Sequence, residues 1–150
     1  MSRIIEFVKI RTAQLSDLEI LLEWRNDFET RKNSHNTDTI DEVNHKKWLE
    51  STLANENIQL FIALFNNNQI GTVRADYNSN LDSWEISWTI AANYRGLGYG
   101  KAMVKCLTDR LKGRFRAEIK EGNTSSIKIA EFCKMSFNKK SNGILYYSNY

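Results

Sequence analysis

The sequence predicts an α+β fold, a mixed α/β domain built around one mostly antiparallel sheet. Segments with strand-like alternation and segments with helical period occur in the order strand, two helices, three strands, helix, strand, helix, strand. Three strands in direct succession form an antiparallel meander, and parallel pairing needs a helix as the crossover. The 150 residues, 41% apolar and 26% charged, have the size and composition of one domain, 1–150.

The first part of the chain carries one expected strand and one expected helix. Residues 4–11 alternate as a strand. Residues 16–19 have the residue types of a capping box, and leucines at helical spacing follow, so a first helix should end near residues 26–27. Residues 24–38 are dense in charged side chains and lack an apolar period, which predicts a loop or a broken helix.

A second helix and a hairpin are expected in the middle of the chain. Thr39 and Glu42 have capping-box spacing at the start of a helical pattern that runs to Leu53. Residues 59–65 and 70–77 have the composition of strands. The asparagine-rich connection between them tolerates left-handed backbone, so these two strands should form the hairpin.

The last part of the chain begins with a strand over residues 84–90, followed by a glycine-rich turn and a helix. Residues 115–120 then form another strand, and residues 126–135 have helical spacing. Residues 144–148 are the last expected strand. This arrangement places the glycine-rich turn between a strand and a helix.

The glycine-rich turn has the chemistry of a phosphate-binding loop. Its sequence is Tyr94-Arg95-Gly96-Leu97-Gly98-Tyr99-Gly100-Lys101. Glycines on alternate positions remove the Cβ atoms that would keep a ligand from the backbone, and amides at the start of a helix suit a phosphate. A P-loop requires Ser or Thr where Ala102 stands, and a dinucleotide fingerprint requires another glycine spacing. The remaining alternative is a plain glycine-rich turn.

This loop resembles the pyrophosphate loop of the GNAT superfamily of acetyl-CoA-dependent N-acetyltransferases, whose pattern Arg95, Gly98 and Gly100 match. Asn123 with Ser126 resembles the start of the last helix in that family. The resemblance covers essentially the whole chain. It implies a GNAT fold with a sheet of six to seven strands and four flanking helices. It also implies a splay between the fourth and fifth strands, where the pantetheine arm lies.

The same resemblance implies acetyl-CoA as the co-substrate. Backbone amides of residues 95–100 would hold the pyrophosphate, and the Arg95 side chain would add charge at the mouth of the loop. Edge amides near Ile90 and Ala91 would bond the pantetheine. The residues expected to bind the coenzyme are Ile90, Ala91, Arg95, Gly96, Leu97, Gly98, Tyr99, Gly100, Lys101, Asn123 and Ser126.

Glu85 is the candidate catalytic residue. Alternation places it with Ser87 and Thr89 on the polar face of its strand. Several GNAT enzymes have a glutamate at this distance before the loop, where it takes a proton from the amine directly or through water. The alternative is a surface carboxylate that pairs across the sheet with Arg74.

The general acid is not assigned by the resemblance. Many members have a tyrosine in the last helix, where this chain has Ala130 or Phe132, depending on the alignment. Tyr146 and Tyr147 on the last strand are the candidates for the general acid in its place. Tyrosines on a terminal strand, however, are usually packing residues whose hydroxyl faces water. The other alternative is that the thiolate leaves without a general acid.

The charged segment resembles the acceptor lip of GNAT enzymes that acetylate nucleotide-linked amino sugars. Arg25, Arg31 and His35 would then bind a diphosphate, and Trp24 or Trp48 would stack on a base or sugar. The residues expected to bind the acceptor are Trp24, Arg25, Arg31 and His35. The alternative interpretation places both tryptophans in the core and His45 on a solvent-exposed helix face.

We therefore expect an N-acetyltransferase that acts by direct transfer in a ternary complex on a small-molecule amine, most simply a nucleotide-linked amino-deoxy sugar. A ribosomal-protein-type N-terminal acetyltransferase and a non-catalytic acyl-CoA-binding module are the alternatives. The net charge of +3 and the lack of a run approaching about 20 apolar residues predict neither a nucleic-acid nor a membrane partner. The sequence leaves open whether the protein forms a homodimer. The acidic N-terminal stretch predicts a cytoplasmic protein, and the cysteine spacing predicts no metal site.

Overall fold

A seven-stranded sheet in the order β1-β2-β3-β4-β5-β7-β6 forms the centre of the computed structural model, which describes residues 7–150. All neighbouring strands pair antiparallel except β4 and β5, which pair parallel. The strands are β1 (Val8–Thr12), β2 (Ile58–Phe65), β3 (Asn68–Asn78), β4 (Ser83–Ile90), β5 (Phe115–Lys120), β6 (Ser136–Ser141) and β7 (Ile144–Ser148). The predicted fold class is confirmed. Residues 4–6 of the first expected strand lie outside the described residues.

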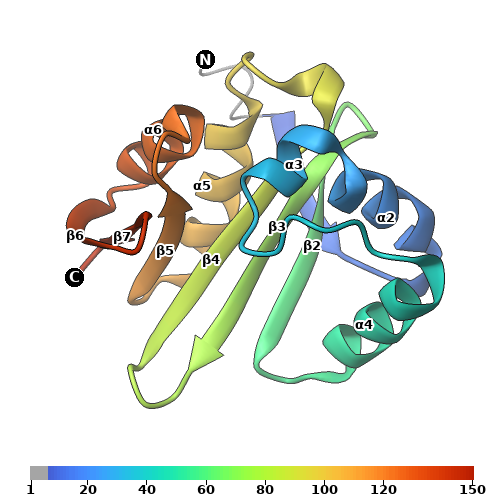
Figure 1. Cartoon of the computed structure of the whole chain (residues 1–150), viewed down its shortest axis with the longest axis horizontal. Coiled ribbons are helices and arrows are strands. Elements are labelled where there is room, and N and C mark those ends of the chain that lie inside the picture. Colours follow the sequence, from blue (N-terminus) through green and yellow to red (C-terminus); the bar gives the residue numbers. More distant parts are fainter. Residues whose placement is uncertain (1–6) are drawn as a thin grey trace.

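Five α-helices and two short 3₁₀ segments surround this sheet (Figure 1). They are η1 (Leu15–Asp17), α2 (Leu18–Asn26), α3 (Phe28–Lys32), α4 (Glu42–Ala54), η2 (Ala92–Tyr94), α5 (Tyr99–Leu111) and α6 (Thr124–Phe132). None of the helices within residues 7–150 has both the length and the apolar character needed to cross a membrane.

The helices cover both faces of the sheet because successive strand residues point to opposite sides. In β2, Phe61 and Ala63 join the core beneath α5 and α6, whereas Leu60 and Ile62 join a smaller core beneath α2 and α4. The near-continuous apolar sequence of β2 follows from this burial on both faces. Figure 1 shows α3 lying across β3 and β4 on the side of α2 and α4.

The predicted splay lies between β4 and β5. Only Trp84 with Phe115 and Glu85 with Arg116 pair across this junction. The Ala91 amide donates to Ile70 O of β3 at 2.8 Å, so antiparallel alternation turns the amides of Trp88 and Ile90 away from β3, toward the gap. The Ala91 amide, expected to bond the pantetheine, thus already has an acceptor within the sheet, whereas the amides of Trp88 and Ile90 face the gap.

Residues 7–150 contain five α-helices rather than the predicted four, because the charged segment is a broken helix. Asp27 has extended backbone between α2 and α3, and its carboxylate caps α3 by accepting from the Thr30 amide at 3.1 Å. The expected capping box at Thr39 is also wrong. Asp41 caps α4 instead, accepting from the Asn44 amide at 2.8 Å, so α4 begins at residue 42.

The first helix begins differently from its expected capping box at residues 16–19. The Asp17 carboxylate accepts from the Gln14 amide at 2.8 Å and forms two bonds of 2.8 Å with Arg11. These bonds fix the turn of η1, and α2 follows directly from it. Asp17 is 4% exposed, and the hydrogen bonds from Arg11 hold the pKa of its carboxyl below the usual range.

The last expected helix is shorter than predicted and makes room for β6. Lys134 has left-handed backbone with φ 68°, and the Met135 amide donates back to Ala130 O at 3.0 Å, which ends α6. The chain then enters β6, an edge strand whose six residues are all exposed and which pairs with β7. Two of them are Lys139 and Lys140.

A close approach between β3, β4 and α5 requires glycine at position 71. A Cβ there would lie 2.3 Å from Thr89 O and 2.7 Å from the end of the Met103 side chain. We expect Gly71→Ala to destabilise the fold by about 1–3 kcal/mol, the usual cost of overpacking. Urea unfolding measures this loss. Gly113→Ala is the matched control because its added Cβ would meet nothing nearer than 3.8 Å, and equal stability of the two variants would contradict the packing argument.

Candidate active site

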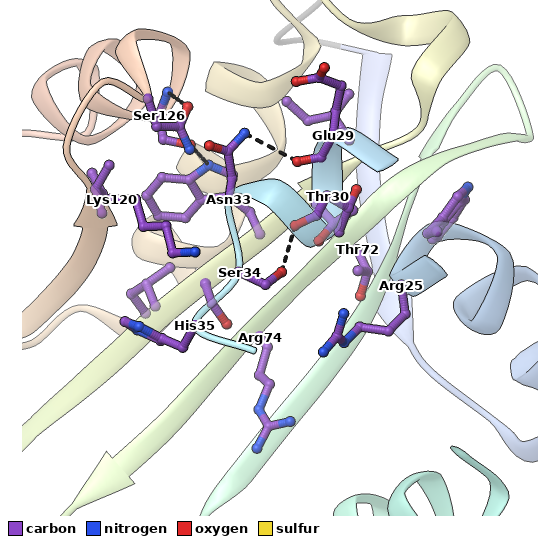
Figure 2. A pocket seen from close by; sticks show the side chains of 18 of the residues that line it. Arg25, Glu29, Thr30, Asn33, Ser34, His35, Thr72, Arg74, Lys120 and Ser126 are labelled. Atoms are coloured by element: carbon purple, nitrogen blue, oxygen red, sulfur yellow. Dashed lines mark hydrogen bonds between the residues drawn. The ribbon is translucent and has the colours of Figure 1, made fainter. Parts of the chain in front are cut away.

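A cavity of about 690 Å³ lies between the splayed strands and the segment that contains α3. Its walls come from α2, α3 and the residues after it, from β3, β4 and β5, and from the start of α6. Figure 2 shows the segment with Thr30, Ser34 and His35 crossing over β3, the strand that carries Thr72 and Arg74. We call residues 27–38 the lip of the cavity.

Arg95 fastens the lip to the end of β4. Its Nη2 donates to Asp27 Oδ2 at 2.7 Å and to Thr30 Oγ1 at 3.2 Å, and its Nε donates to Ile90 O at 3.0 Å. Although burial would raise the pKa of Asp27, the bonds from Arg95 and from the Thr30 amide lower it. The charge of Arg95 is therefore directed to Asp27, which corrects the prediction that it stands at the mouth of the glycine loop.

Further bonds hold the lip along its length. Lys120 Nζ of β5 donates to Lys32 O at 3.1 Å, and Arg25 Nη2 donates to Asn36 O at 3.1 Å. The Asn26 side chain exchanges two bonds of 2.9 Å with the backbone of Ile40. The lip is thus attached to α2, β4 and β5, and the cavity beneath it has a defined roof.

The glycine loop presents unpaired amides at the start of α5. Gly96 and Gly98 have left-handed backbone, with φ 74° and 89°, which only glycine adopts without strain. Among the described residues, no acceptor bonds the amides of residues 96–101. Free amides at the start of a 13-residue helix suit a phosphate, and this arrangement agrees with the role expected for the loop.

The other residues of the loop have structural contacts. Tyr99 packs edge-on against Phe65 and Tyr94. Lys101 Nζ lies 5.6 Å from the centre of the Phe132 ring, and Leu97 is exposed. A Cβ on Gly100 would lie 2.5 Å from Ile90 and 2.6 Å from Ile129, so this glycine lets α5 pack closely beneath β4 and α6.

Asn123 and Ser126 lie where α6 meets the splay. The Asn123 side chain caps α6 by accepting from the Ser126 amide at 3.3 Å. Ser126 Oγ accepts from Trp88 Nε1 at 3.2 Å, which joins α6 to β4 across the gap (Figure 2). Both residues line the cavity, as does Ile90. Trp88 is a site residue that the sequence reasoning missed, because its alternation pattern predicts a purely apolar role.

Glu85 faces the cavity, and the alternative that it pairs with Arg74 is wrong. The register places Glu85 opposite Asp76, and Arg74 binds Asp76 with bonds of 2.6 and 2.9 Å. Glu85 Oε1 instead accepts from Arg116 Nη2 of β5 at 3.3 Å. Arg116 and Glu85 are one of the two residue pairs that precede the splay.

The surroundings of Glu85 raise its pKa to about 7. Burial is the main cause, followed by a hydrogen bond and charge repulsion from Glu118, and Arg116 opposes both. A carboxylate with a pKa near the working pH can both take up and release a proton, which is the requirement for a general base. The position and the raised pKa of Glu85 are compatible with a base, and its catalytic role stays a prediction.

The acceptor residues predicted from the sequence divide into two groups. Trp24, Arg25 and His35 line the cavity, and Trp24 is at the same time 5% exposed within the smaller core. Arg31 does not line it, since its guanidinium donates to Asn26 O and Thr37 O and stacks over Phe28. Its side chain is used to stabilise the lip.

His45 lies inside the cavity wall and not on a wet helix face. It is 1% exposed, stacks on Trp48 and shares a bond of 3.1 Å between Nε2 and Leu18 O. Burial lowers the pKa of His45, so the ring is neutral and its Nδ1 is an acceptor. His45 Nδ1 and Arg25 Nη1 are buried polar atoms that have no partner in the described part of the chain. Such atoms are candidates for ligand contacts.

Neither tyrosine of the last strand lines the cavity. Tyr147 is buried against Phe137, and Tyr146 lies beneath Lys139. Ala130 is fully buried in the core. The hydroxyl groups that line the cavity belong to serine and threonine residues, with Ser126 at the splay itself. The prediction that Tyr146 or Tyr147 substitutes for the missing tyrosine is therefore not supported by their positions.

Solved structures share this fold over nearly their whole length. A domain from Methanocaldococcus jannaschii is 26% identical, with a TM-score of 0.83 over 94% of this chain and 96% of that one. Aminoglycoside acetyltransferase AAC(6')-Ib in complex with coenzyme A is 19% identical, with a TM-score of 0.79 over 94% and 92%. Spermidine N-acetyltransferase from Vibrio cholerae, in complex with CoA and spermine, is 13% identical, with a TM-score of 0.82 over 95% and 94%.

Comparison with curated proteins finds no match. The family model described as acetyltransferase (GNAT) domain matches residues 8–136, which include the lip, β4 with Glu85, the glycine loop and α6. The chain therefore belongs to the GNAT acetyltransferase family, and it is an N-acetyltransferase that uses acetyl-CoA.

Proposed function

We propose that the protein acetylates the amine of a nucleotide-linked amino-deoxy sugar by direct transfer in a ternary complex. The observation that carries this proposal is the opposite chemistry of two parts of one cavity. Glu85 supplies a base on β4, and the Arg25 side chain lines the same cavity and supplies a positive charge. A substrate with both an amine and a diphosphate satisfies both groups.

In this proposal, groups around the splay carry out the steps of acetyl transfer. The amides of Trp88 and Ile90 bond the pantetheine arm of acetyl-CoA as a neighbouring strand would, and the amides of residues 96–101 hold its pyrophosphate. Glu85 takes a proton from the acceptor ammonium, and the neutral amine then attacks the thioester carbonyl. The Ser126 hydroxyl lies at the same gap and can donate a hydrogen bond to the departing sulfur.

A base with a pKa near 7 favours an enzyme over a binding module of the same fold, because binding alone does not require such a group. The structural neighbours act on polycationic amines in two cases, an aminoglycoside and spermidine. The positive charge of Arg25 in the cavity lining favours an acceptor that also carries an anionic group.

The first prediction concerns the coenzyme. Acetyl-CoA at a hundredfold excess over its Kd should stabilise the fold by about 2.7 kcal/mol, which a thermal melting scan detects. Acetyl-pantetheine, which lacks the pyrophosphate, should give a much smaller shift at the same concentration because it leaves the loop amides unpaired. An equal shift with both compounds would exclude the loop from coenzyme binding.

The second prediction concerns the acceptor. Release of CoA thiol, measured with a UDP-linked amino-deoxy sugar, an N-terminal peptide, spermidine and an aminoglycoside, should be fastest with the sugar. Arg25→Ala should raise the KM for that sugar about tenfold or more, the loss expected for a hydrogen bond to a charged group. Arg114→Ala is the control, because Arg114 stacks on Tyr150 outside the cavity. Turnover of the peptide alone would exclude the sugar as the acceptor and would favour an N-terminal acetyltransferase instead.

The third prediction concerns Glu85. Glu85→Gln keeps the shape and polarity of the side chain but removes its basicity, so kcat should fall by about 10²- to 10⁴-fold. In the wild type, kcat should rise with pH through about 7, as Glu85 loses its proton. The loss of kcat in Glu85→Gln should be smaller at higher pH, because more of the acceptor amine is then neutral without a general base.

Stability measurements show whether the fall in kcat of Glu85→Gln reflects lost catalysis or lost folding. The folded state binds the Glu85 proton more tightly than the unfolded chain, so Glu85 reduces stability as pH rises from 4.5 to about 7. Glu85→Gln removes this penalty and should be at least as stable as the wild type at pH 8 in urea unfolding. Near-normal kcat across the pH range would remove Glu85 from the mechanism.

A further inference from the structure

The proposed reaction releases one proton in each turnover, and that proton needs a route out of the cavity. An ammonium ion and a thioester give an amide, a thiol and one proton. The ammonium loses one proton to the base before attack, and the attacking nitrogen loses a second proton, which protonates the thiolate. Glu85 must therefore pass its proton to solvent before the next cycle. The following inference rests on the proposed function and concerns this step.

Glu118 lies beside Glu85 on the neighbouring strand. It follows Arg116 by two residues on β5, so both side chains point to the cavity face. Glu85 and Glu118 line the same cavity, and Glu118 contributes to the raised pKa of Glu85. The Glu118 side chain is 25% exposed. Ala117 and Ile119, which alternate with these residues, are buried in the core beneath α5 and α6.

His35 of the lip stands over Glu118. Its Nε2 lies 3.4 Å from Glu118 Oε1, and its side chain is 61% exposed. Glu85, Glu118 and His35 thus form a continuous series of groups from the buried base to the surface. An imidazole can accept and release a proton, and neighbouring carboxylic groups can exchange one. Figure 2 shows His35 and Ser34 on the segment that crosses in front of the strands.

The charged groups around this series direct the proton outward. Arg116, 3.3 Å from Glu85, favours the ionised form of Glu85. Asp76 faces Glu85 from β3 but is bound by Arg74. The Lys120 amine is held by a backbone carbonyl of α3. Among these neighbours, Glu118 is the carboxylate that connects Glu85 to a group at the surface.

We propose that Glu118 and His35 form the exit path for the proton that Glu85 removes from the acceptor. Protonated Glu85 gives the proton to the Glu118 carboxylate and becomes ionised again. Glu118 gives it to the His35 imidazole, and the resulting imidazolium releases it to water or buffer. No bond other than those to the proton is formed or broken, and each group returns to its starting state.

A structural role is the alternative, in which the contact between His35 and Glu118 only holds the lip in place. Such a role would affect the KM for the acceptor and the melting temperature, but it would leave the pH profile of kcat and its response to buffer unchanged. The test therefore compares these two kinds of measurement.

The first experiment is Glu118→Gln, with the UDP-linked amino-deoxy sugar as acceptor. Loss of the neighbouring carboxyl should move the acidic limb of the kcat profile to lower pH and lower its plateau. Glu121→Gln is the matched control, because Glu121 directly follows β5 but lies outside the cavity and binds Lys140 on the surface. An unchanged profile for Glu118→Gln would overturn the proposal.

The second experiment is His35→Asn, which alters an exposed residue and should not threaten folding. In dilute buffer kcat should fall by about an order of magnitude, less than the ~10²-fold loss typical of a group that acts directly. Added imidazole should restore it at unchanged acceptor KM. A wild-type kcat in dilute buffer, or a loss that imidazole does not repair, would overturn the path through His35.

A third measurement separates this inference from the proposed function. The Glu85 carboxyl can be titrated by NMR in ¹³C-labelled protein without any substrate. Glu118→Gln should shift that titration to lower pH, whereas Glu121→Gln should leave it unchanged. If no amine is acetylated, the proposed function fails, and this titration still decides whether Glu118 governs the protonation of Glu85. An unshifted titration would overturn the inference.

Discussion

The Arg95 guanidinium joins the two halves of the site. It binds the last residue of β4, the capping carboxylate of α3 and a hydroxyl within α3, so one side chain fixes the end of the splay and the start of the lip. Each bond is charge-assisted and partly buried, which makes it stronger than a bond between neutral groups. The glycine loop begins at the next residue. The end of the splay and the lip therefore share one anchor.

The period of two in the strands determines what the cavity can do. On β3, β4 and β5 the residues facing the lip are polar or charged, among them Thr72, Arg74, Glu85 and Glu118, whereas those between them fill the core beneath α5 and α6. The same alternation that buries Ile86 thus presents Glu85 to the cavity. Because β5 leaves β4 after two residue pairs, the polar face of one strand becomes accessible to a substrate while the apolar face stays packed.

Much of the fold was predictable because its signals are local. The strand alternation, the helical periods and the glycine loop each lie within a short window, and they predicted the meander and the strand face that carries Glu85. The splay was implied by the resemblance to the GNAT fold. The partners of the charged side chains were not predictable. Arg74 binds Asp76 and Arg95 binds Asp27 because of strand register and helix packing, which no single segment encodes. His45 shows the same limit, since only the packing of α2 against α4 buries it.

The lysines of β6 have a consequence for how the protein behaves at high concentration. An outer strand offers a row of unpaired backbone groups on which another chain can build. β6 is exposed on both faces, and it carries Lys139 and Lys140 in the middle of that row. A second molecule that added a copy of this strand would bring like charges together at the spacing of adjacent strands. The sheet thus discourages its own extension at this edge and resists fibre growth there.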